Sequence, residues 1–135
     1  MINREDLESF FIRMGVEAEE VDENMWVLEG EEDAPNVVVT YAPPVIVLRL
    51  KVFDLPEGAR DDQLAPLFRR LLELNASDLV HGSYGIEEGD VALSDALDLE
   101  TLDFQELRNS YESIVFGATT QLKELAQLVP VAHRG

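Results

Sequence analysis

Residues 36–53 read NVVVTYAPPVIVLRLKVF, and this stretch decides the fold. Its two parts, 36–42 and 45–53, are dense in β-branched and aromatic residues, which favour β-strands. Pro43 and Pro44 cannot extend a hydrogen-bonded ladder, so they predict the turn between two strands. On the second strand one face is wholly apolar and is therefore predicted to face the core; its residues are Ile46, Leu48, Leu50 and Val52.

The opposite face of this strand pair is also rich in apolar side chains. On the second strand it carries Val45, Val47, Arg49, Lys51 and Phe53, and on the first strand Val37, Val39 and Tyr41 alternate with Val38, Thr40 and Ala42. An antiparallel sheet with helices on one side normally keeps its other side polar. We therefore expect a cover over these valines. It is either the chain's own first or last helix, or a dimer partner or client segment, which strand addition would suit.

Outward from this pair, the spacing of apolar residues predicts three helices and three more strands. Asn3 and Gly15 are capping signals for the first helix, and Pro130 stops the last. The helices are expected over residues 3–15, about 62–74 and 103–129, and the strands over residues 25–29, 79–86 and 91–93.

The predicted order of elements is therefore α-β-β-β-α-β-β-α. The chain has 135 residues, of which 46% are hydrophobic, and this is enough to build one core without disulfides. The most economical architecture is an α+β fold in which one antiparallel sheet packs against a layer of helices. We expect a single domain that spans residues 1–135.

The last predicted helix is longer than the sheet that it would cover. About 27 residues span roughly 40 Å of helix, whereas a typical strand spans roughly 20 Å. The far end of the helix should therefore overhang the sheet and need another subunit or another chain to cover its apolar seam. The seam residues in this part are Ala118, Leu122, Leu125 and Val129.

The charge of the chain limits its partners. The formal net charge is −18, from 28 acidic and 10 basic residues, so nucleic acid and anionic membranes are not expected partners. Nine acids lie between Glu17 and Asp33 with no Lys or Arg among them, which favours solubility, a basic protein partner or a divalent cation. The sequence shows neither a signal-peptide pattern nor an apolar run of about 20 residues, so we expect a cytoplasmic protein.

The residues that usually carry chemistry do not form a recognisable centre. There is no cysteine, and the only histidines are His81 and His133, so neither a zinc site nor thiol chemistry is expected. The sequence contains no nucleophile elbow, phosphate-binding loop or dinucleotide fingerprint. Two groups of acids lack the spacing of a calcium loop. The first is Asp54, Glu57, Asp61 and Asp62, and the second is Asp95, Asp98, Glu100 and Asp103. We expect no catalytic residue, cofactor or metal.

Three stretches resemble a known group of proteins. They are Leu71–Asn75 (LLELN), Gly82–Leu93 (GSYGIEEGDVAL) and Leu99–Leu107. With the order of elements, they resemble the type III secretion chaperone-like fold, which includes the Tir chaperone and YbjN-like families. In such families a helix that ends in a Leu/Asn-rich motif leads into a two-stranded hairpin and a closing helix. The resemblance covers most of the chain and implies a non-enzymatic protein that forms dimers and binds extended segments of other proteins.

The leading hypothesis is a chaperone-like or adaptor module that forms a homodimer and binds client segments through a hydrophobic surface. Its expected anchors are Trp26, Tyr41, Val45, Val47 and Phe53. An alternative is an acidic regulatory domain that recognises a basic protein, for which binding should depend strongly on salt. A third interpretation is a metal-assisted hydrolase built on the acidic loops, for which divalent metals should raise the melting temperature.

Overall fold

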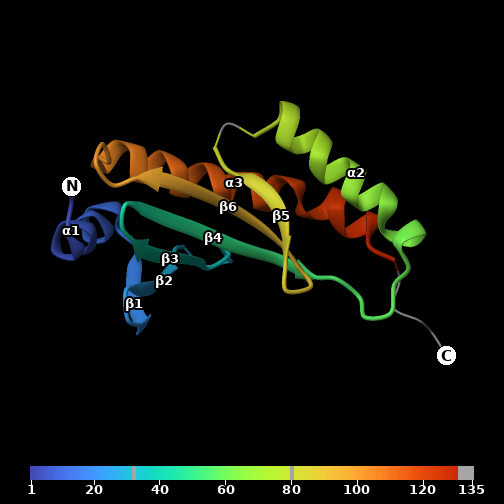
Figure 1. Cartoon of the computed structure of the whole chain (residues 1–135), viewed down its shortest axis with the longest axis horizontal. Coiled ribbons are helices and arrows are strands. Elements are labelled where there is room, and N and C mark those ends of the chain that lie inside the picture. The colour runs from blue at the N-terminus through green and yellow to red at the C-terminus, as the bar shows by residue number, and fades with distance from the viewer. Residues whose placement is uncertain (32, 80, 131–135) are drawn as a thin grey trace.

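The computed structural model describes residues 1–31, 33–79 and 81–130. Within these residues the chain forms three helices and six strands (Figure 1). In chain order they are α1 (Arg4–Met14), β1 (Glu17–Asp22), β2 (Met25–Glu29), β3 (Val37–Ala42), β4 (Val45–Asp54), α2 (Asp61–Ser77), β5 (Ser83–Glu87), β6 (Asp90–Asp98) and α3 (Phe104–Leu128). The predicted α+β class is confirmed, and β1 is an additional strand before the three that were expected.

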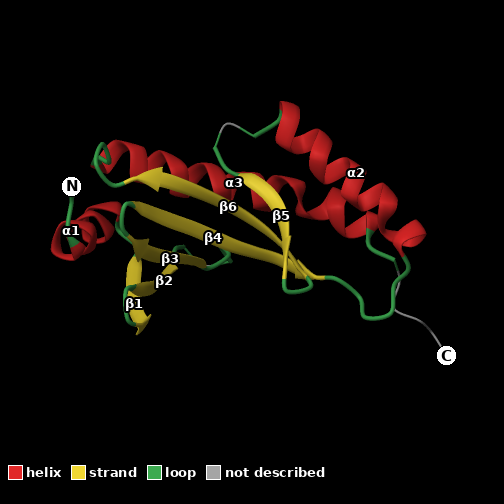
Figure 2. Cartoon of the chain, in the orientation of Figure 1, coloured by secondary structure: helices red, strands yellow, loops and turns green. Residues whose placement is uncertain are grey.

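All of these strands form one antiparallel sheet in the order β1-β2-β3-β4-β6-β5 (Figure 2). The strand pair that the sequence singled out lies at the centre, because β4 pairs with β3 on one side and with β6 on the other. The two edges of the sheet are β1 and β5. The expected single antiparallel sheet is therefore confirmed.

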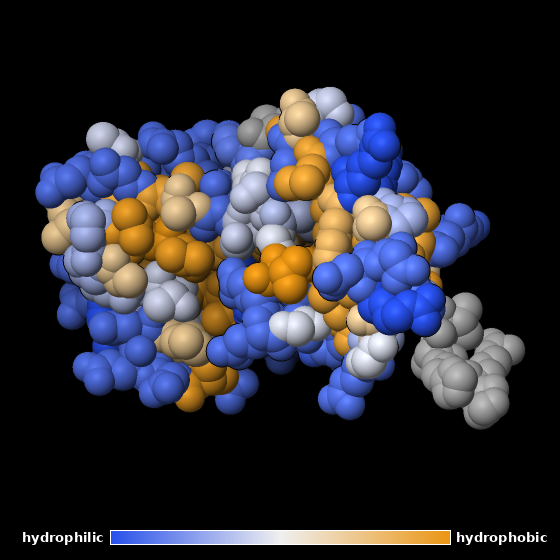
Figure 3. Space-filling view, turned by 45° about the vertical axis from the view of Figure 1, so that its right-hand side comes forward, coloured by the Kyte–Doolittle hydropathy of each residue, from blue (hydrophilic) through white to orange (hydrophobic). Residues whose placement is uncertain are grey.

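The helices cover one face of the sheet and form a single core with it. On β4, Ile46, Leu48 and Leu50 are at most 1% exposed, as the alternation predicted. They cluster with buried residues of all three helices, among them Leu7, Phe11, Leu67, Leu74, Leu107 and Ile114. α3 runs along the sheet, and α2 lies beside its C-terminal half (Figure 1). Hydrophobic side chains also reach the surface in patches that hydrophilic side chains separate (Figure 3).

The helix boundaries follow from side chains that bond to free backbone N–H groups. Asn3 accepts the N–H of Asp6 at 2.8 Å, and the Asp6 carboxylate accepts the N–H of Asn3 at 3.0 Å. Gly15, in the left-handed conformation at φ 76°, ends α1 as predicted. Asp103 caps α3 by accepting the N–H of Glu106 at 2.8 Å. Among the described residues, no helix combines the length and apolarity that crossing a membrane requires.

Strand β1 has no counterpart in the sequence prediction. Its sequence is EAEEVD, and all six of its residues are exposed. Acidic residues are depleted in strands, and an exposed edge strand shows no alternation of apolar residues to reveal it. Pairing with β2, from Glu17 opposite Glu29 onward, holds the segment as a strand. The acids of this segment therefore lie along an edge of the sheet.

The expectation that another chain must cover the far end of the last helix is wrong. α2 packs against the C-terminal half of α3 and takes up the seam, so Ala118 is 4% exposed and Leu125 is fully buried. Val129 is half-buried against the core, and of the four seam residues Leu122 alone is widely exposed, at 44%. The sequence could not show this cover, because it did not reveal which end of α3 lies beside α2.

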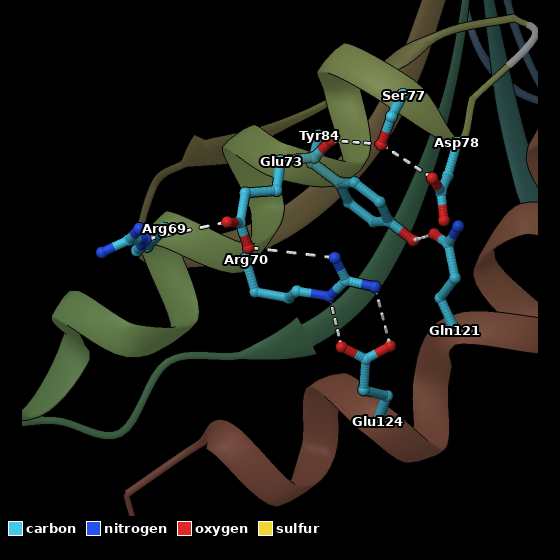
Figure 4. A network of polar contacts seen from close by, with 8 residues as sticks. All are labelled: Arg69, Arg70, Glu73, Ser77, Asp78, Tyr84, Gln121 and Glu124. Carbon is cyan, nitrogen blue, oxygen red and sulfur yellow. Dashed lines mark hydrogen bonds and ion pairs between the residues drawn. The ribbon is translucent and has the colours of Figure 1, made fainter.

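A polar network fastens α2 to β5 and α3 (Figure 4). Arg70 of α2 makes a two-point ion pair with Glu124 of α3. The Tyr84 hydroxyl of β5 donates to Gln121 of α3, and burial raises the pKa of Tyr84 to about 12. These contacts place α2 against the edge of the sheet that β5 forms.

Asn75 completes this junction. Its amide donates to the carbonyl of Tyr84 at 3.1 Å and its oxygen accepts the N–H of Tyr84 at 2.7 Å. The side chain thus takes the place that a neighbouring strand would occupy beside β5. Asn75 ends the LLELN motif noted in the sequence, which gives that motif a structural role.

We predict that Asn75→Ala lowers the free energy of unfolding by about 2 kcal/mol, because it leaves two peptide groups of a buried residue without partners. Urea unfolding followed by circular dichroism measures the change. Ser77→Ala is the matched control, since the Ser77 hydroxyl bonds to the Glu73 carbonyl on the exposed side of the same helix. It should cost less than about 0.5 kcal/mol. Equal effects of the two substitutions would contradict the role assigned to Asn75.

Candidate protein-binding surface

The sheet face turned away from the helices is the candidate binding surface, here called the open face. Cross-strand pairing builds it in rows, with Met25 opposite Thr40 and Thr40 opposite Val47 in one row, and Val27 opposite Val38 in the next. Its half-buried residues on β2, β3 and β4 are Met25, Val27, Val38, Thr40, Val45, Val47 and Arg49. The neighbours of these residues along each strand are in the core, so the alternation of the pleat separates the two faces.

The open face is apolar over β2–β4 and charged toward β5 and β6. Arg49 forms an ion pair with Glu87, and the Lys51 amine lies 2.6 Å from Asp54 and 3.7 Å from Asp90. The hydrogen bond from Lys51 lowers the pKa of Asp54, whereas the hydrogen bond with Asp54 raises the pKa of Asp90. The charges at this end therefore have partners within the chain, and the apolar end is the part that a partner would cover.

Two of the five predicted anchors, Val45 and Val47, lie on the open face. Trp26 does not, because it is 1% exposed and points into the core. Its ring packs edge-on against Phe11, with centroids 5.8 Å apart, and the Arg4 guanidinium lies 5.0 Å from the ring centroid. Trp26 is thus a packing residue under α1 in this structure and is unavailable to a partner.

Tyr41 and Phe53 also lie on the helix side of the sheet. Tyr41 pairs with Ile46 on the core face, and its hydroxyl donates to the carbonyl of Ile2 at 3.1 Å. At Phe53 the register shifts after Lys51, and Phe53 comes to face the buried Val91. This β-bulge turns the end of β4, so that Phe53 packs against the core. Simple alternation along the sequence placed Phe53 on the opposite face because a bulge leaves no clear signal there.

The structure adds four residues to the apolar end of the open face: Met25, Val27, Val38 and Thr40. The alternation of residues 37–42 had already separated Val38 and Thr40 from their neighbours. Which of the two sets faced the helices became clear only from the pairing of Val39 with the buried Leu48. The signal was therefore present in the sequence, but it needed the register of β3 against β4.

A second apolar surface lies on the outer side of α2. Ala65, Phe68, Leu72 and Ala76 recur at helical spacing and line a shallow hollow together with Asp61, Arg69 and Glu73. Leu72 is 68% exposed and Phe68 is half-buried. Glu73 of this hollow also lies 3.8 Å from Arg70, which belongs to the network that joins α2 to α3.

A groove of about 910 Å³ lies between the end of α1, the β2–β3 loop and α3. Its apolar lining includes Met14, Val16, Val115 and Phe116, and Phe116 is 69% exposed. Arg108 also lines the groove, so its lining is mixed in polarity.

Several acids that were considered as cation ligands serve local structure. Asp62 pairs with Arg60 at 3.0 Å, and Asp98 accepts the N–H of Glu100 at 2.9 Å. Asp95 accepts the hydroxyl of the fully buried Ser110 at 2.7 Å. Among the residues that the structure describes, no three acids or histidines come together in a way that could hold a metal ion.

Solved structures share this fold at low sequence identity. The ExoU–SpcU complex from the type III secretion system of Pseudomonas aeruginosa aligns with a TM-score of 0.68 and 14% identity, over 91% of this chain and 97% of that chain. The ExsC–ExsE complex aligns with a TM-score of 0.60 and 21% identity, over 96% and 94%. YbjN from E. coli aligns with a TM-score of 0.64 and 14% identity, over 91% and 93%. These similarities confirm the secretion-chaperone-like fold that the sequence motifs had suggested.

The comparison of sequences defines the family. None of the curated proteins matches the chain, but a family model described as CesT_Tir_1 matches residues 2–130. This family consists of non-enzymatic secretion chaperones, which confirms the expected non-enzymatic character and removes the metal-assisted hydrolase from consideration. Because the match spans nearly the whole chain, the protein belongs to the CesT/Tir chaperone family.

Proposed function

We propose that this chain binds extended segments of partner proteins on the apolar end of the open face, as a chaperone-like or adaptor module. One observation carries the proposal: Val38, Val45 and Val47 stay half-buried on the side of the sheet opposite the three described helices. Two structural relatives support it. The HopA1–SchA chaperone–effector complex and the SycH chaperone with a fragment of YscM2 were both solved with a bound partner. The proposed place of action is the cytoplasm.

The gain from covering this surface is sufficient for specific binding. Complete burial of a Val or Met side chain stabilises by about 1.5–3 kcal/mol, so finishing the burial of a half-exposed one contributes roughly 1 kcal/mol. The apolar end of the open face holds five such side chains: Met25, Val27, Val38, Val45 and Val47. With backbone hydrogen bonds to a sheet edge, the sum offsets the entropy of ordering the segment and supports affinity near 1 μM as an order of magnitude.

We predict that Val38→Asp combined with Val47→Asp reduces the amount of co-purifying client protein by about tenfold or more, because it places two charges in an apolar interface. Quantitative mass spectrometry of chains captured from the native cell measures the loss. The fold should persist in circular dichroism, since both positions are partly solvent-exposed.

Phe116→Asp is the matched control for this variant. It introduces one carboxylate, where the double variant introduces two, at a 69% exposed apolar residue of α3 that lines the groove, away from the open face. Clients should remain bound to it. Loss of clients from Phe116→Asp, with retention by the double variant, would move the binding site to the groove and refute the proposal.

We also propose that the protein is a homodimer in which the apolar stripe of α2 meets the same stripe of a second copy. A two-fold axis through the stripe would set the two helices antiparallel, so that a charge of one copy faces the opposite charge of the other. Arg69, 83% exposed at its side chain, and Glu73, 51% exposed, flank Leu72 and lie 3.7 Å apart within α2. In the dimer each would also face the opposite charge of the other copy. The α3 residues first considered for this role are mostly packed inside the chain.

We predict that wild-type protein elutes as a dimer in size-exclusion chromatography with light scattering and that Leu72→Asp elutes as a monomer. A charge at the centre of the stripe would have to be buried without a partner, which costs several kcal/mol. Ile12→Asp, at a 79% exposed residue of α1, should leave the dimer intact. A monomeric wild type, or a dimeric Leu72→Asp, would contradict the assignment.

A further inference from the structure

The two edges of the sheet differ in what they leave free for a partner. At β5, the Asn75 side chain already holds the N–H and the C=O of Tyr84. At the other edge, β2 is the one neighbour of β1 among the described strands, and all six residues of β1 are exposed. A free strand edge is the template on which an extended segment can add. The structure therefore directs an added strand to β1.

The side chains of the β1 edge repel one another. Glu17 lies directly opposite Glu29 across the β1–β2 pair, and Glu19 follows on the same face opposite Val27. Like charges directly opposite each other destabilise a sheet, whereas opposite charges stabilise it. A cationic side chain from a partner would therefore relieve repulsion that the chain itself leaves in place.

The chain supplies few bases to this edge. Between Arg13 and Arg49 the sequence contains no Lys or Arg, and Arg4 pairs with Glu20. Elsewhere, bases are matched with acids outside the edge, in the pairs Arg49–Glu87, Lys51–Asp54, Arg60–Asp62, Arg69–Glu73, Arg70–Glu124 and Arg108–Glu112. Within residues 1–31, 33–79 and 81–130, no ion pair joins a base to Glu17, Glu19 or Glu29, so these carboxylates suit a cationic partner.

We propose that the β1 edge binds an extended segment that carries Lys or Arg at alternate positions. This inference rests on the proposed function and adds the chemistry of the client. Side chains two residues apart on an added strand point to the same face, at the spacing of Glu17 and Glu19. Cations at those positions meet the carboxylates of β1, and the side chains between them turn toward the helix side, beside Ala18.

Fluorescence anisotropy with two labelled peptides tests the proposal on the full chain. One peptide alternates Lys with Val, and the other alternates Glu with Val. The Lys peptide should bind, and the Glu peptide should bind about 100-fold more weakly. Raising the salt concentration from about 50 to 300 mM should weaken the binding of the Lys peptide. Equal binding of the two peptides, or no binding of the Lys peptide, would overturn the proposal.

A pair of triple variants separates the β1 edge from the overall charge. Replacing Glu17, Glu19 and Glu29 by Gln should weaken the binding of the Lys peptide about tenfold or more. The control variant, Glu57→Gln, Asp61→Asn and Glu88→Gln, changes the net charge equally in the β4–α2 loop, at the start of α2 and in the β5–β6 turn. In Figure 1 these segments lie away from β1. This control should weaken the binding of the Lys peptide less than about threefold. Equal weakening by both variants would show that the peptide senses net charge alone, and would overturn the site.

Failure of this inference and failure of the proposed function give different results. If the Lys peptide fails but Val38→Asp with Val47→Asp still loses its clients, the open face binds clients of another chemistry. If the double variant also keeps its clients, the open face itself is not the binding surface.

Discussion

The alternation of side chains along β4 is the constraint on which the rest of the structure depends. Ile46, Leu48 and Leu50 must be buried, and all three helices gather on their side of the sheet to bury them. The same pleat then sends Val45 and Val47 to the other side, where the described helices do not reach. The helices therefore cover one face of the sheet, and the apolar part of its second face is the surface on which we propose that another chain binds. Folding and binding thus use the two halves of one pattern.

Hydrogen bonding protects one edge of the sheet from pairing with a second copy, and charge protects the other. The β5 edge is blocked by the Asn75 side chain, which occupies the position of a neighbouring strand. The β1 edge is protected by its carboxylates, because a second copy of the chain would bring the same charges against it. Negative charge therefore excludes self-pairing and remains compatible with a cationic segment. The net charge of −18 fits this division of roles.

Much of the fold could be predicted from the sequence, because apolar residues alternate along its central strands and the helices α1 and α3 carry clear N-terminal caps. Strand β1 could not be predicted, because its acidic sequence has no apolar alternation and the segment is a strand through its pairing with β2. The positions of the residues proposed for the candidate site were predicted in part. Val45 and Val47 followed from alternation, but the bulge before Phe53 and the burial of Trp26 under α1 depend on packing between segments far apart in the sequence. The same is true of Leu125, which α2 covers.

The most direct test of the open face is the relaxation of valine methyl groups by a soluble paramagnetic agent, measured by NMR on the isolated protein. The account predicts several-fold faster relaxation for Val38, Val45 and Val47 than for Val37 and Val39, which are 0% exposed. Slow and equal relaxation of all five valines would contradict it, because the protein would then cover that face by itself.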